Sequence, residues 1–107
     1  MEKLSPTTEH NIQNNIRQYL GSKGILCFRC NVGTIKTFDG RMFSTGLPDG
    51  FPDLFALPGN GQIVFIECKT RKGKQREAQI NFERIIKSRG YKYIIARSVE
   101  DVENGMV

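Results

Sequence analysis

The sequence contains Asp53-Leu54-Phe55-Ala56-Leu57, followed by Pro58-Gly59-Asn60-Gly61 and then by Ile63-Val64-Phe65-Ile66-Glu67-Cys68-Lys69. Two short apolar runs joined by Pro, Gly and Asn residues are typical of antiparallel strands with a turn between them. The segment therefore predicts a buried β-hairpin over 53–69. The outer ends of this apolar hairpin carry two carboxylates and one ammonium group.

The predicted hairpin brings its charged side chains together at one end. Alternate side chains of a strand share a face, so Glu67 and Lys69 point the same way, with Cα atoms about 7 Å apart. Antiparallel pairing places the start of the first strand opposite the end of the second, which allows Asp53 to approach Glu67. Buried carboxylates are costly without a partner, and Mg²⁺ takes oxygen ligands of this kind. We expect a Mg²⁺ site (Mn²⁺ as substitute), with Lys69 polarising a water or a scissile phosphate.

The same residues have a simpler interpretation. Glu67 and Lys69 are also consistent with a surface ion pair on a half-exposed strand, and Asp53 with a turn residue after a proline. A second Pro-Asp pair, Pro48-Asp49, competes with Asp53 for the ligand position. We favour Asp53 because it leads directly into an apolar strand, and a ligand needs a rigid support.

The remaining chain predicts alternating helices and strands. We expect helices over 5–23 (capped by Ser5 or Thr7) and 75–89, strands over 25–30, 34–38, 41–44 and 91–96, and a short helix capped by Ser98 and Asp101. This order predicts an α/β fold with a central mixed β-sheet flanked by α-helices. Its β-α-β unit over 62–96 should pair two strands in parallel. The chain length supports one modest core, so residues 1–107 are expected to form a single domain.

A second, more polar hairpin is predicted around Asp39-Gly40, because Asp-Gly tolerates the positive φ angles of a tight turn. This hairpin shows no large apolar stripe and carries Lys36 and Arg41. We expect either a flap that contacts nucleic acid or a second subunit, or a plain polar hairpin.

The balance of charge favours a polyanionic partner. Sixteen Lys and Arg residues against eleven Asp and Glu residues give a net charge of +5, which suits a phosphate backbone. The residues expected to contact DNA are Lys36, Arg41, Arg71, Lys72, Lys74 and Arg76, four of which directly follow Lys69.

The sequence shows neither a membrane-spanning stretch nor a signal peptide. The longest apolar stretches fall far short of the ~20 residues that span a bilayer, and the N-terminus lacks the apolar core of a signal peptide. We expect no membrane association and a cytoplasmic location (the host cytosol if the protein is viral).

Three cysteines without a secretion signal do not predict disulfides. Cys27 and Cys30 have zinc-knuckle spacing but lack a second Cys/His pair, so we expect packing residues.

Pro52-Asp53 and Glu67-Cys68-Lys69 resemble the PD-(D/E)xK nuclease signature. From about Glu9 to Val99, with an acidic first helix and Gly50-Phe51-Pro52-Asp53, the chain resembles the stand-alone virus-type replication-repair nuclease (VRR-NUC) domain. The resemblance implies a restriction-endonuclease-like core and metal-dependent hydrolysis of phosphodiester bonds.

The resemblance also implies roles for single residues. The metal ligands it implies are Asp53, Glu67, the Cys68 backbone carbonyl and, as an additional ligand, Glu9. Lys69 would orient the water or stabilise the transition state, and Gln79 would orient Lys69. The alternatives are a first-turn Glu9 that favours the helix dipole and an exposed helix glutamine at position 79.

The expected substrate also comes from the resemblance, because stand-alone family members from phages and bacteria resemble resolvases of branched DNA. A two-fold symmetric four-way junction is best matched by a homodimer with two active sites. We therefore expect a homodimeric Holliday-junction resolvase of DNA repair. The alternatives are an endonuclease of ordinary duplex DNA, specific or nonspecific, and a DNA-binding module without catalysis.

Overall fold

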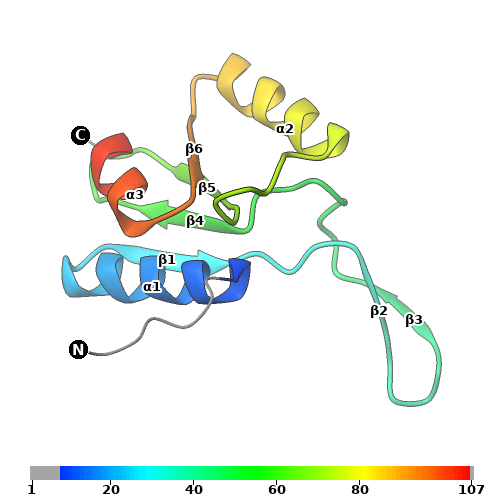
Figure 1. Ribbon diagram of the computed structural model, residues 1–107. Coiled ribbons are helices and arrows are strands. Elements are labelled where there is room, and N and C mark those ends of the chain that lie inside the picture. Colours follow the sequence, from blue (N-terminus) through cyan, green and yellow to red (C-terminus); the bar gives the residue numbers. More distant parts are fainter. Residues whose placement is uncertain (1–7, 107) are drawn as a thin grey trace.

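The computed structural model describes residues 8–106 and contains three helices and six strands in that range (Figure 1). In chain order the elements are α1 (Glu9–Ser22), β1 (Leu26–Arg29), β2 (Thr34–Lys36), β3 (Met42–Ser44), β4 (Leu54–Leu57), β5 (Val64–Cys68), α2 (Glu77–Ser88), β6 (Lys92–Ala96) and α3 (Val99–Gly105). Four strands form one sheet in the order β1-β4-β5-β6, and β2 and β3 form a second, two-stranded sheet. The pairs β1–β4 and β4–β5 are antiparallel, whereas β5–β6 is parallel. The predicted mixed sheet and parallel β-α-β unit are therefore confirmed.

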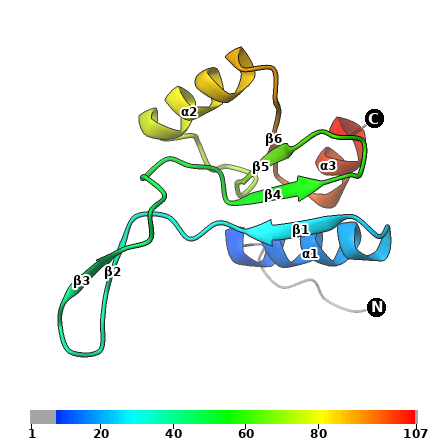
Figure 2. The same ribbon diagram turned by 180° about the vertical axis from the view of Figure 1, so that it is seen from behind.

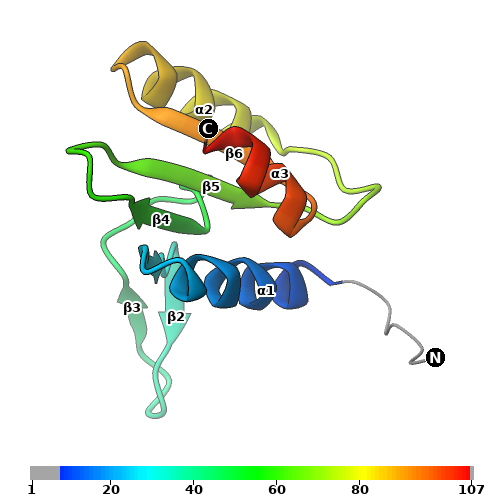
Figure 3. The ribbon, with the colours of Figure 1, turned by 90° about the vertical axis from the view of Figure 1, so that its left-hand side faces the viewer.

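One face of the sheet carries the main hydrophobic core. Ile12, Ile16 and Leu20 recur at helical spacing along α1 and are fully or almost fully buried. Their partners include Leu54 of β4 and Ile66 of β5, and α3 adds to the same cluster. Figure 3 shows α1 along one side of the sheet and α2 on the other.

Aromatic side chains fill the opposite face, beneath α2. The Phe51 ring packs edge-on against Phe65 and against Phe82 of α2, with centroid distances of 6.0 and 5.8 Å. Tyr91 packs on Phe65 at 5.9 Å. Through Phe51, these contacts hold α2 over β5, the strand that carries Glu67.

The helix ends correct two expectations. Helix α1 begins at Glu9 rather than at residue 5, because Thr8 is extended and its side chain accepts a hydrogen bond from the Asn11 N–H at 3.1 Å. The expected caps Ser5 and Thr7 lie outside the described residues. Ser98 caps α3 as expected, but the Asp101 carboxylate accepts from the Arg97 N–H at 2.8 Å, one residue before the cap. Within residues 8–106, no helix has the length and apolar content needed to cross a membrane.

The hairpin of β2 and β3 forms an arm that projects from the body (Figures 1 and 2). Its turn spans Thr37 to Arg41, wider than the expected two-residue turn, with Gly40 at a φ of 86°. Four large apolar side chains are exposed on it, which are Ile35, Phe38, Met42 and Phe43. The sequence predicts no large apolar stripe here; the register places Ile35 opposite Phe43 on one face, whereas Met42 pairs with Lys36 on the other.

Candidate active site

Asp53, Glu67 and Lys69 meet at one edge of the sheet, where β4 begins and β5 ends. The register pairs Leu54 with Ile66, and one further step places Asp53 opposite Glu67. Lys69 directly follows β5, and its N–H donates to the Ala96 carbonyl of β6 at 3.0 Å. The strand pairing thus brings together the three residues that the apolar hairpin pattern singled out.

Asp53 is held by the main chain of the neighbouring strands. Its Oδ2 accepts a hydrogen bond from the Cys68 N–H at 2.7 Å, and its carbonyl accepts one from the Cys30 N–H at 2.8 Å. Burial raises the pKa of the Asp53 carboxyl, and the nearby carboxylates of Glu9 and Glu67 add to this rise. The Cys68 N–H and the Lys69 ammonium act in the opposite direction on the same pKa. Burial therefore disfavours the anionic form of Asp53 relative to a carboxylate in water.

Glu67 is completely buried, and its two carboxylate oxygens differ. Oε1 accepts hydrogen bonds from the Tyr93 hydroxyl and from Nε2 of Gln75, the latter at 3.2 Å. Oε2 is also buried, yet no group of residues 8–106 donates to it. A buried carboxylate oxygen without a partner is costly, and a divalent cation at this oxygen would remove the cost. Burial also raises the pKa of Tyr93, as does the adjacent Glu67, so its hydroxyl stays a donor.

Lys69 is buried as well, with 5 % of its surface exposed. The ion pairs among residues 8–106 are Arg41–Asp39, Arg76–Asp49 and Lys87–Glu83. Lys69 takes part in none of them, and it faces the negative charge of Asp53 at longer range. This excludes the simpler interpretation of an exposed Glu67–Lys69 ion pair. An ammonium group placed in this way is available for an anionic substrate.

Two further candidate ligands border the site. Glu9 is exposed in the first turn of α1, close enough to Asp53 and Cys68 for its charge to act on both. The N–H of Cys68 points to Asp53, and the carbonyl of a strand residue points to the same side as its N–H. Among residues 8–106, no group of three or more Asp, Glu, His or Cys side chains is arranged to hold a metal ion. The available donors are thus Asp53 and Glu67 with main-chain oxygen, and Glu9 at the border of the site, a set that suits Mg²⁺ with several retained waters.

Gln75 contacts Glu67, whereas the structure gives Gln79 a different contact. The Gln79 Oε1 accepts the Arg76 N–H at 2.8 Å, which caps the start of α2. Gln75, in the loop before α2, donates to Glu67 and also to Glu83 Oε1, at 3.0 Å. Neither Gln75 nor Tyr93 was expected beside Glu67 from the sequence. Strand alternation places Tyr93 on the same face as Glu67 only once the β5–β6 register is known.

The predicted DNA-contacting residues separate into three groups. Arg71, Lys72 and Lys74 are exposed in the loop between β5 and α2, and none of them takes part in an ion pair within residues 8–106. Arg76 is already bound, with two guanidinium nitrogens 2.8 and 3.0 Å from the Asp49 carboxylate. Lys36 and Arg41 lie on the arm, where Arg41 pairs with Asp39 at 3.0 Å.

The position of Asp49 bears on the choice between the two Pro-Asp pairs. Its carboxylate is exposed, and the hydrogen bond from Arg76 lowers its pKa. Asp49 is thus a surface partner of Arg76, whereas Asp53 lies beside Glu67. The geometry favours Asp53 as the ligand.

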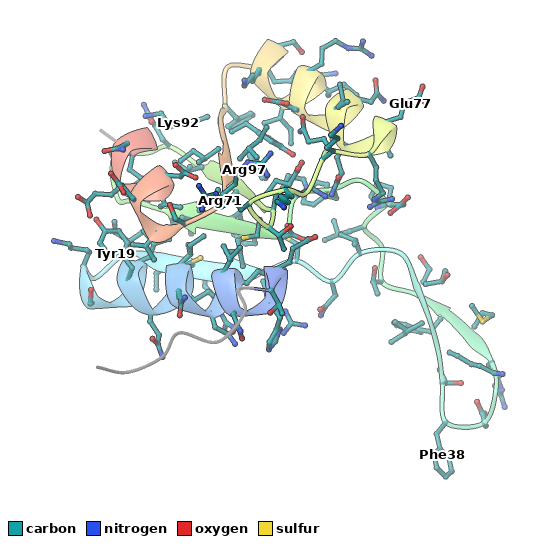
Figure 4. The ribbon with its side chains drawn as sticks, viewed as in Figure 1. Tyr19, Phe38, Arg71, Glu77, Lys92 and Arg97 are labelled. Atoms are coloured by element: carbon teal, nitrogen blue, oxygen red, sulfur yellow. The ribbon has the colours of Figure 1, made fainter. Side chains whose placement is uncertain are left out.

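Arg97 donates hydrogen bonds to the backbone of residues 70–74, which are called the basic loop. Its Nη1 donates to the backbone carbonyls of Thr70, Arg71 and Gly73, at 3.3 Å for Arg71 and 2.7 Å for Gly73. In Figure 4 the labelled Arg71 and Arg97 lie near each other at this loop, while Phe38 stands at the far end of the arm. The loop that follows Lys69 is therefore fastened to the segment after β6.

Comparisons with known proteins bear on the fold. No protein-family model matches the sequence, and no curated protein sequence matches it. A solved structure described as "VRR_NUC domain" superposes with a TM-score of 0.67 at 22 % sequence identity, covering 92 % of each chain. The likeness includes the central mixed sheet and its flanking helices. This chain thus has the restriction-endonuclease-like fold of a VRR_NUC domain.

Proposed function

We propose that this protein is a divalent-cation-dependent nuclease that hydrolyses phosphodiester bonds of DNA. The observation that carries the proposal is the buried Oε2 of Glu67, which receives no hydrogen bond from residues 8–106, in a residue that the strand register places opposite Asp53 and two positions before the buried Lys69. The likeness of the fold to a VRR_NUC domain and the PD-(D/E)xK-like sequence support the same conclusion.

The proposed site assigns Asp53, Glu67 and the Cys68 carbonyl to Mg²⁺ or Mn²⁺, with Glu9 as a further ligand. When bound, such an ion lowers the pKa of a water and neutralises charge on a phosphate. Lys69 places a fixed positive charge where negative charge develops on the scissile phosphate, and its burial strengthens this interaction. An orienting role of Gln79 toward Lys69 rests on the sequence resemblance.

The proposed substrate is branched DNA, and the proposed active form is a homodimer. The resemblance to stand-alone VRR-NUC domains supports both. The exposed loop with Arg71, Lys72 and Lys74 supplies positive charge soon after Lys69 that no acidic group of residues 8–106 pairs with. The arm is the surface we propose for the dimer, because a two-stranded hairpin alone is marginally stable and this one exposes four large apolar side chains. A second copy would cover them in a two-fold interface.

Cleavage of a labelled four-way junction tests the proposal, with a linear duplex of matched sequence as the comparison. Wild type, Lys69→Ala and Lys23→Ala are assayed in Mg²⁺, in Mn²⁺ and in EDTA. Lys23 is the matched control because it is exposed at the end of α1. We expect cation-dependent cutting of the junction by wild type and Lys23→Ala, and a loss of about 100- to 1,000-fold in Lys69→Ala.

Other outcomes change the conclusion in defined ways. Equal cutting of the duplex would keep the chemistry and remove the preference for branched DNA. Binding of the junction without cleavage in any cation would support a DNA-binding module without catalysis.

A further inference from the structure

One oxygen of the Glu67 carboxylate accepts hydrogen bonds from two different parts of the chain. The Tyr93 hydroxyl reaches Oε1 from β6, and the Gln75 amide reaches the same atom from the loop before α2. Oε2 receives no hydrogen bond from residues 8–106. Two donors on one oxygen and none on the other is an uneven arrangement for a buried carboxylate, since sharing them would satisfy both oxygens.

Both donors are themselves fixed. Tyr93 is 7 % exposed and pairs with Phe65 in the parallel register, so its hydroxyl extends along the strand toward Glu67. The Gln75 Nε2 also donates to Glu83 Oε1 at 3.0 Å, and Glu83 Oε2 is 2.8 Å from the Lys87 ammonium. Gln75 is thereby anchored to α2. The orientation of the Glu67 carboxylate is set by β6 on one side and by α2 on the other.

We propose that Tyr93 and Gln75 are positioning residues that occupy Oε1 of Glu67 and present Oε2 to the divalent cation. This inference rests on the proposed function, because it assigns an orienting pair to the proposed ligand. Residues behind a metal ligand fix its geometry and basicity. With Oε1 engaged, Glu67 offers the cation a single oxygen.

A purely structural role for Tyr93 is the competing account. In that account the hydroxyl only satisfies a buried carboxylate, and its removal lowers stability equally with and without cation. The positioning role predicts in addition a loss of cation affinity in protein that remains folded. Affinity for the cation, measured without DNA, separates the two accounts.

The experiment titrates Mn²⁺ into the DNA-free protein and follows free Mn²⁺ by electron paramagnetic resonance. The variants are Tyr93→Phe, Gln75→Leu, Glu67→Gln and the control Tyr91→Phe. Tyr91 is matched because it is a half-exposed tyrosine that packs on Phe65. We expect Tyr93→Phe and Gln75→Leu to bind Mn²⁺ about 10- to 100-fold more weakly, and Tyr91→Phe to bind as wild type does. Cleavage by Tyr93→Phe should recover part of its rate as Mn²⁺ is raised.

The outcomes separate this inference from the proposed function. Wild-type affinity in folded Tyr93→Phe and Gln75→Leu, with binding lost in Glu67→Gln, overturns the positioning role and leaves the metal site standing. Mn²⁺ binding that does not depend on Glu67 overturns the proposed metal site and this inference together. If Tyr93→Phe does not fold, Gln75→Leu decides, because its side chain lies in a loop. In the Glu67→Gln background, Tyr93→Phe should have no further effect on the remaining affinity.

Discussion

The Cys68 N–H donates a 2.7 Å hydrogen bond to Oδ2 of Asp53, which joins the residue before β4 to the last residue of β5. This bond fixes the carboxylate at the sheet edge but does not offset its burial, since the pKa of Asp53 is still raised. The charge of Asp53 is therefore retained at a cost to the metal-free protein. Sites that hold a cation commonly carry such a cost until the ion binds.

We predict that Asp53→Asn abolishes cleavage and raises the melting temperature of the metal-free protein at neutral pH. A raised pKa means that the native state binds a proton more readily than the unfolded state, so wild-type stability falls as pH rises through that pKa. The difference in melting temperature between Asp53→Asn and the wild type should shrink as the pH is lowered toward the ordinary pKa of an aspartate. Thermal unfolding in EDTA across acidic and neutral pH measures it. Asp49→Asn is the control, and it should lower the melting temperature at neutral pH. The hydrogen bond from Arg76 lowers the pKa of Asp49, so the ionised aspartate stabilises the wild type at neutral pH.

Gly50→Ala should lower the free energy of unfolding by about 1–3 kcal/mol. This loss comes on top of the cost of placing an alanine at a positive φ. Gly50 has a φ of 90°, and a Cβ there would lie 2.7 Å from the main chain of Ala78, in the first turn of α2. Gly46→Ala is the matched control, because its φ of 91° is nearly the same and no atom lies within 4 Å of the added Cβ. Urea denaturation compares the two variants. Equal losses would show that the close approach of the loop to α2 is unimportant.

Arg97→Lys should loosen the basic loop although it keeps the charge. A lysine cannot reproduce the planar guanidinium that faces the carbonyls of Thr70, Arg71 and Gly73. We expect faster hydrogen exchange over residues 70–74, together with weaker DNA binding in a fluorescence anisotropy assay. Arg84→Lys on the exposed side of α2 is the control for a change from arginine to lysine. Unchanged exchange in Arg97→Lys would contradict the fastening role.

The salt dependence of DNA binding should distinguish unpaired from paired arginines. Replacing Arg71 or Lys72 by Ala should lower the slope of log affinity against log salt by about 1, the value for one lost phosphate contact. Arg76→Ala should change the slope less, because its guanidinium is held by Asp49. A larger change for Arg76 than for Arg71 would mean that DNA displaces Asp49 from Arg76.

Ile35→Ser on the arm should weaken the proposed dimer by about 10- to 100-fold, as expected for the roughly 1.5–3 kcal/mol of a buried isoleucine side chain. Ile80→Ser on α2 is the matched control, since Ile35 and Ile80 are 54 % and 50 % exposed. Analytical ultracentrifugation measures both variants against wild type. A sedimentation profile of Ile35→Ser that equals that of Ile80→Ser would remove the arm from the interface.

The sequence was sufficient to place Asp53 opposite Glu67, because strand alternation and a short turn depend on neighbouring residues only. It could not place Tyr93 on Glu67, because the β5–β6 register depends on how α2 packs between them. The contact of Gln75 with Glu67 could not be predicted either, because Gln75 was expected inside the helix, whereas α2 begins at Glu77 and leaves Gln75 in the preceding loop. The start of α1 was misplaced because a Ser-Pro-Thr-Thr segment offers several competing caps.

The two ends of the arm are hydrogen-bonded to each other where they join the body, and this junction is called the neck. The Gly33 N–H donates to the Leu47 carbonyl at 2.7 Å, and the Thr45 N–H donates to the Gly33 carbonyl at 3.0 Å. Below the neck, the bond from Cys30 to Asp53 continues the pairing of β1 with β4. The backbone pairing that holds Asp53 is thus separate from the pairing within the arm, so a longer, shorter or differently surfaced ribbon beyond Gly33 and Thr45 should leave the position of Asp53 unchanged.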